Sequence, residues 1–165
     1  MSALYDFTQW AKEHNWKAEL KKTPSEHLNL PHEIIQRYGS LPEDFSNFLK
    51  NVESLSNKRK TAWFLCEDDY HKEDSPYSFV WNEAELRSLD NALGDRALMA
   101  DIKSWWDKHL PVMIMECKSG CQYFAIDCLT GGIVKGCEPN FEETTPVATS
   151  FKNLLEKIIT GEIPL

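Results

Sequence analysis

Apolar residues recur every three or four positions in several stretches of the chain, which is the spacing of one helix face. The first stretch, residues 3–21, predicts an amphipathic opening helix that ends before Pro24. A second, short helix is predicted over residues 31–39. The clearest pattern follows Pro42 and places apolar side chains on one face at Phe45, Phe48, Leu49 and Val52.

Further helices are predicted in the middle of the chain and near its end. Asn82 and Glu85 have the spacing of a capping box, which would start a helix with a leucine stripe at Leu86, Leu89 and Leu93. Residues 96–109 again show helical spacing. Residues 151–159 carry the last apolar helix face, and Gly161 follows it as a stop.

Other stretches are short, apolar and rich in aromatic or β-branched residues, which is typical of strands. Residues 61–66 predict a buried strand, and residues 79–81 predict a brief one. Beyond these, residues 112–115, 123–126 and 133–134 are separated by glycine-containing turns and predict three consecutive antiparallel strands. The sequence therefore predicts a single α+β domain, residues 1–165, in which an antiparallel β-meander sheet packs against flanking helices.

Composition narrows the functional class. The 165 residues, 42% of them hydrophobic, are enough for one core that needs neither metal nor disulfides. A net charge of -8 repels phosphate backbones, so we expect no nucleic-acid partner. The sequence contains neither the roughly 18 consecutive apolar residues of a membrane span nor an export signal, so we expect no membrane association and a cytoplasmic location. Five cysteines, an odd number, predict reduced thiols.

Four groups of residues follow one another along the chain: Leu41–Phe45 with Phe48 and Leu49, Trp105–Pro111, Tyr123–Asp127 with Gly132–Val134, and Ser150 and Phe151 with Leu154 and Leu155. Their order resembles the SUKH superfamily, which groups yeast cell-wall assembly and glucan-synthesis regulators with bacterial toxin-immunity proteins. The resemblance spans residues 36–160 and leaves the opening helix outside. Residues 51–60 depart from it, because they contain no glycine where the superfamily commonly has a glycine-rich turn. The resemblance implies helices packed on one antiparallel sheet and a protein-binding role without catalysis.

The densest negative charge lies in residues 67–74. Its carboxylates are Glu67, Asp68, Asp69, Glu73 and Asp74. Their spacing lacks the ladder of a calcium loop, which leaves a solvated acidic loop and a protein-binding surface as the main alternatives. A binding surface of this kind would steer a basic partner toward the protein. We therefore predict this segment as the partner-binding site.

Two other residues are candidates for partner binding. Trp105 and Trp106 are adjacent and point about 100° apart on a helix, so we assign Trp105 to the core and Trp106 to a possible partner anchor. A second packing contact is the alternative for Trp106. Asp127 lies at a predicted strand end, where it could bind backbone N–H groups or face a partner.

Cysteine chemistry is the remaining possibility. Cys117 and Cys121 flank a turn, and a zinc site would need further ligands from Cys128, Cys137 or His109. A thiol enzyme would combine Cys121 with His109 and Asp127. Packing of small thiols in apolar strands explains the same cysteines more simply. We therefore expect no metal, no cofactor and no catalytic residue.

Two functional hypotheses follow. The first is a non-catalytic immunity protein that neutralises a cognate, basic, nuclease-type bacterial toxin. The second is an intracellular regulatory scaffold similar to the cell-wall and glucan-synthesis regulators, binding several endogenous proteins weakly. The absence of low-complexity segments in the sequence favours the first, since scaffolds commonly carry disordered tails.

Overall fold

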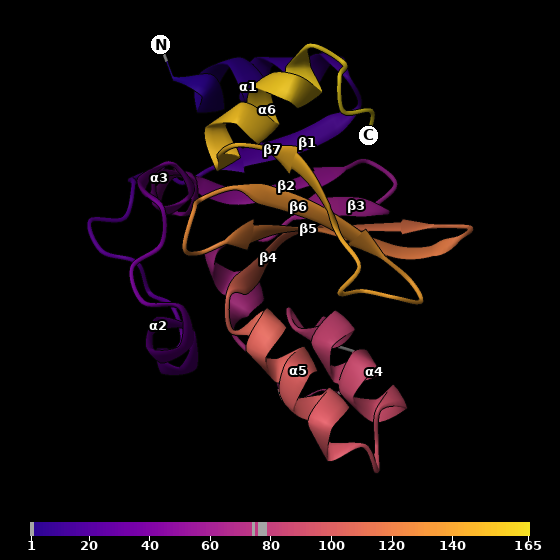
Figure 1. Ribbon diagram of the computed structural model, residues 1–165. Coiled ribbons are helices and arrows are strands. Elements are labelled where there is room, and N and C mark those ends of the chain that lie inside the picture. The colour runs from indigo at the N-terminus through magenta and orange to yellow at the C-terminus, as the bar shows by residue number, and fades with distance from the viewer. Residues whose placement is uncertain (1, 74, 76–78) are drawn as a thin grey trace.

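The structure is a computed structural model that describes residues 2–73, 75 and 79–165 (Figure 1). Within these residues, seven strands form one antiparallel sheet in which each strand pairs with the next along the chain. The strands are β1 (Trp16–Leu20), β2 (Val52–Asn57), β3 (Ala62–Phe64), β4 (His109–Cys117), β5 (Gly120–Asp127), β6 (Ile133–Cys137) and β7 (Thr145–Ala148). The predicted α+β class and the antiparallel meander are confirmed.

Helices occupy the connections and the two ends of the described chain. They are α1 (Ala3–Glu13), α2 (His32–Tyr38), α3 (Glu43–Asn51), α4 (Glu83–Asn91), α5 (Arg96–Trp106) and α6 (Phe151–Ile159), with a short 3-10 helix, η1 (Glu67–Tyr70). Figure 1 shows α1 and α6 on one side of the sheet and the α4–α5 pair on the other. None of the helices in the described residues has the length and apolar character needed to cross a membrane.

An aromatic cluster joins the first side of the sheet to three helices. The ring of Phe64 in β3 lies 5.4 Å from that of Phe7 in α1, 5.9 Å from Phe48 in α3 and 6.2 Å from Phe151 in α6, measured between centroids. All four side chains are buried. The prediction that Phe45, Phe48 and Leu49 face the core is confirmed. We call this side of the sheet the Phe64 face.

The opposite side, which we call the Trp63 face, is partly covered by α5. Trp106 is fully buried there, with its ring 5.2 Å from that of Tyr123 in β5. Tyr123 lies across Gly136 of β6, where an added Cβ would stand 2.5 Å from the tyrosine hydroxyl. Only glycine therefore allows Tyr123 to pack so close to the neighbouring strand.

Arg37 connects α2 to both helices of the α4–α5 pair. Its guanidinium donates two hydrogen bonds to the buried carboxylate of Glu85, at 2.8 and 2.7 Å, and a third to Asp107 at 2.8 Å. Burial alone would lower the pKa of Arg37, but the hydrogen bonds to Glu85 raise it above its usual value. Because Glu85 is only 6% exposed, this bidentate pair fixes the position of α4.

The predicted opening helix is wrong beyond Glu13. Asn15 has a φ of 60°, a left-handed conformation that turns the chain before Trp16. Residues 16–20 then form β1, with Trp16 buried and Lys17 exposed, and pair with β2. Val52 belongs to β2 and not to the preceding helix, so the glycine-free stretch after α3 is mostly strand.

Other local predictions also differ from the structure. Phe79 and Val80 are irregular and form no strand, while β7 was not predicted. The Asn82 side chain makes no capping hydrogen bond, and the Glu85 carboxylate, which would complete the capping box, binds Arg37 instead. The leucine stripe of α4 does not face the core: two of its members, Leu86 and Leu93, are exposed, and the residues buried instead are Ala84, Glu85 and Ser88. The helix predicted to reach His109 ends at Trp106, and His109 starts β4.

Replacing Phe48 by alanine should lower the free energy of unfolding by about 3–5 kcal/mol, because it leaves a cavity between α3, β3 and α6. The measurement is urea denaturation followed by circular dichroism. Leu129→Ala is the control, since Leu129 is 78% exposed, and it should change stability by less than about 0.5 kcal/mol. Equal effects of the two substitutions would contradict the assignment of Phe48 to the core.

Candidate functional site

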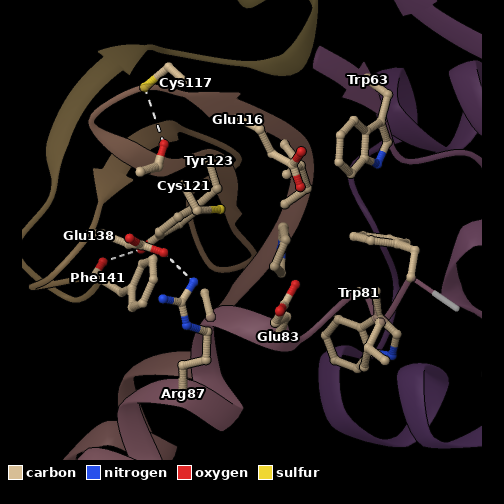
Figure 2. Close-up of a pocket in the computed structure, with 16 residues that line it drawn as sticks. Trp63, Trp81, Glu83, Arg87, Glu116, Cys117, Cys121, Tyr123, Glu138 and Phe141 are labelled. Carbon is tan, nitrogen blue, oxygen red and sulfur yellow. Dashed lines mark hydrogen bonds and ion pairs between the residues drawn. The ribbon is translucent and has the colours of Figure 1, made fainter. Parts of the chain in front are cut away.

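A pocket of about 260 Å³ opens on the Trp63 face beside α4 (Figure 2). Its aromatic walls come from Trp63, Phe79, Trp81, Tyr123 and Phe141. Its charged side chains are Glu83, Arg87, Glu116 and Glu138. Pockets for drug-sized ligands hold about 300–1,000 Å³, so this one suits a single side chain or a small molecule.

Strand register explains why these side chains share one face. Trp63 of β3 pairs with Ile114 of β4, and Ile114 pairs with Tyr123 of β5. Glu116 pairs with Cys121 two residues further along the same two strands. Because side chains alternate between faces, all five project toward the pocket while Phe64 projects into the core.

The aromatic wall is held by ring packing. Trp63 and Phe79 meet edge to face, with ring centroids 5.4 Å apart and an interplanar angle of 87°. Trp81 is buried, and its ring centroid lies 6.1 Å from those of both Tyr38 and Tyr70. Its indole Nε1 has no hydrogen-bond partner among the described residues, so packing alone positions this ring.

The charged side chains divide into a paired and an unpaired group. Arg87 forms an ion pair with Glu138, and its guanidinium carbon lies 5.5 Å from the centre of the Phe141 ring. Glu83 and Glu116 are exposed, and neither carboxylate has a hydrogen-bond or ion-pair partner among the described residues. Figure 2 shows them on the same side of the pocket, opposite the tryptophans.

The cysteines of the pocket differ in reactivity. Burial and the charges of Glu138 and Glu83 raise the pKa of the Cys121 thiol to about 11. Cys117 at the rim is exposed, and its hydrogen bond with the Ser119 hydroxyl, 2.9 Å long, lowers its pKa. A half-buried thiol with a raised pKa and an exposed thiol with a lowered pKa therefore lie on either side of one turn.

The predicted acidic segment, residues 67–74, is only partly available to a partner. Glu67 accepts hydrogen bonds from Lys21 Nζ at 3.3 Å and from the Asn29 backbone N–H at 2.9 Å. Asp69 accepts a hydrogen bond from the Cys66 N–H at 2.8 Å, and burial raises its pKa. Asp68 and Glu73 are exposed. Asp74 lies outside the described residues. The carboxylates of Glu67 and Asp69 thus hold η1 in place against the neighbouring loop and strand end.

Of the two alternatives for Trp106, the structure agrees with the second packing contact and not with the partner anchor. Its side chain is fully buried, and its Nε1 donates a 2.9 Å hydrogen bond to Glu142. Trp105 is the more exposed of the two and stacks on His109, with ring centroids 3.8 Å apart. The buried residues of α5 are Ile102 and Trp106, which lie one turn apart on the same face of the helix, and this face packs against Tyr123.

The candidate catalytic trio is not assembled. His109 and Asp127 pair across β4 and β5, but Cys121 lies six residues from Asp127 along β5, about 20 Å at the rise of a strand. Asp127 instead accepts a 2.9 Å hydrogen bond from the Leu129 N–H. In the described part of the chain, no three His, Cys, Asp or Glu side chains group so as to hold a metal ion.

Comparisons with known proteins supply no relative for this chain. No family model, curated protein or solved structure matches it. The resemblance to the SUKH superfamily therefore stays a prediction. The features of this chain that bear on its function are the pocket, its charged side chains and the acidic residues around it.

Iodoacetamide at pH 8 should modify Cys117 about tenfold faster than Cys121, because a lowered pKa and exposure increase the accessible thiolate. Peptide mass spectrometry after timed quenching measures both rates. Ser119→Ala, which removes the hydrogen bond to Cys117, should slow its alkylation and leave the exposed Cys137 unchanged. Faster modification of Cys121 than of Cys117 would contradict this description of the pocket rim.

Proposed function

We propose that this protein binds a basic protein partner in the cytoplasm and neutralises it by covering its surface, as an immunity protein does for a nuclease-type toxin. The observation that carries the proposal is the pocket on the Trp63 face, where aromatic rings and the carboxylates of Glu83 and Glu116 stand together. Aromatic anchors in pockets dominate many protein interfaces. Protection of this kind needs no chemistry from the binding protein.

The distribution of charge supports a basic partner. Residues 61–165 contain nine basic and 18 acidic side chains, whereas residues 1–60 contain nine and eight. Trp63 lines both the main pocket and a neighbouring depression that includes Asp69, so η1 adjoins the same surface. Exposed Asp68 adds to its negative charge. Such a field accelerates encounter with a positively charged protein.

The resemblance to the SUKH superfamily supports the same proposal, because its bacterial members include many toxin-immunity proteins. It also contains regulators that act as scaffolds. The two roles differ in what they bind: an immunity protein binds one toxin tightly, and a scaffold binds several endogenous proteins weakly. The same purification therefore discriminates between them.

Association with the partner should depend on the pocket carboxylates. The partner is obtained by affinity purification from the native host and identified by mass spectrometry, and we expect one basic protein encoded beside this one. In stopped-flow measurements, Glu83→Lys/Glu116→Lys should slow association at least about tenfold at low salt, and added salt should reduce the difference. Glu67 and Asp69 are left unchanged because both are tied to the fold.

The matched control is Glu13→Lys/Glu26→Lys, which changes the net charge equally at two exposed positions outside the pocket. It should slow association by about twofold or less. Equal slowing by both variants would contradict a site at the pocket. Recovery of several weakly bound, non-basic proteins would support the scaffold role instead. Co-expression with the partner should restore growth that the partner alone prevents.

A further inference from the structure

One part of the pocket binds a cation of this chain, the guanidinium of Arg87. The Arg87 guanidinium lies over the Phe141 ring and pairs with the Glu138 carboxylate. An aromatic face and a carboxylate thus satisfy one guanidinium from two directions. Stacking and charge pairing together are a common way for proteins to bind arginine.

The other part of the pocket contains the same two components without a cation among the described residues. Trp63 and Trp81 supply aromatic rings, and Glu83 and Glu116 supply carboxylates with no described partner. Glu116 lies one side-chain position beyond Ile114, the cross-strand partner of Trp63, and so is a diagonal neighbour of that ring. In Figure 2 its carboxylate lies on the side of Trp63, and the Glu83 carboxylate points into the space between Arg87 and the tryptophans.

We propose that this part of the pocket, lined by Trp63, Trp81, Glu83 and Glu116, is a receptor for one guanidinium group, supplied by an arginine side chain of the basic partner. The inference rests on the proposed function for the source of the arginine, but the receptor itself can be tested without the partner. The pocket volume of about 260 Å³ fits one side chain and excludes a folded element.

Arginine suits these walls better than lysine. A guanidinium is flat, so it can stack on an indole while its N–H groups reach two separate carboxylates. An ammonium is a compact, strongly hydrated charge that gains less from stacking. Since Glu83 projects from the first turn of α4 and Glu116 from β4, the two acceptors approach from different elements, as a forked donor requires.

The electrostatics of the neighbouring thiol agree with this assignment. The pKa of Cys121 is raised by burial and by the charges of Glu138, Glu83 and Glu116, and is lowered by Arg87. All three carboxylates therefore act on one point of the pocket, and among the described residues that affect Cys121 only Arg87 opposes them. A second cation would offset one of the two negative charges that Arg87 leaves uncompensated.

The test is a titration of the ¹⁵N-labelled protein with Nα-acetyl-arginine methylamide at constant ionic strength. The indole N–H resonances of Trp63 and Trp81 should shift with a dissociation constant of about 1–10 mM, while that of Trp10 in α1 stays fixed. The neutral citrulline counterpart should bind at least about tenfold more weakly. Glu83→Gln/Glu116→Gln should weaken arginine binding about fivefold or more, and Glu13→Gln/Glu26→Gln should not.

Shifts that are equal for arginine and citrulline, or an absence of shifts at Trp63 and Trp81, would overturn the inference. Equally tight binding of the lysine counterpart would overturn the assignment of arginine. Unchanged resonances away from the pocket show that each variant is folded. If the probe fails while the partner still associates in a carboxylate-dependent way, only the receptor is refuted. If the probe binds but no basic partner exists, the proposed function is refuted and the receptor stands.

Discussion

The packing of Phe64 against α1, α3 and α6 is the contact on which the rest of the structure depends. Phe64 touches Phe7, Phe48 and Phe151, which come from helices far apart in the sequence. Because side chains alternate along a strand, burying Phe64 on this face sends Trp63 to the other. A slip of one residue in β3 would exchange the two and remove the pocket wall. The core therefore determines the position of the site.

Helix packing covers only part of the Trp63 face. Trp106 packs on Tyr123, which in turn requires Gly136 in the next strand. Arg37 and Glu85 then fix where α4 begins, and with it the position of Glu83. The sheet beside α4 is left with rings and carboxylates that no described helix covers. This uncovered part of the sheet is the surface to which we propose that the partner binds.

Much of the fold could be predicted from the sequence, because helix faces and strand alternation are local patterns. The aromatic face of α3 and the antiparallel strands of residues 112–134 are examples. Features that depend on contacts between residues far apart in the sequence could not be predicted. The facing of α4 depends on Arg37, 48 positions before Glu85, and the five residues of β1 fit a helix pattern until the turn at Asn15 is known. The pocket could not be predicted, because its lining comes from three strands, from residues 79–87 and from residues 138–141, which only the folded chain brings together.

We propose that a partner binds to the Trp63 face, while the Phe64 face is the core. Hydroxyl-radical footprinting of the complex with the purified partner tests it directly, because Trp63 and Trp10 are both half-buried but belong to different sides of the sheet. Mass spectrometry measures the oxidation of each tryptophan in the free and bound protein. We expect the partner to protect Trp63 from oxidation and to leave the oxidation of Trp10 unchanged. Protection of Trp10 with unaltered oxidation of Trp63 would contradict this proposal.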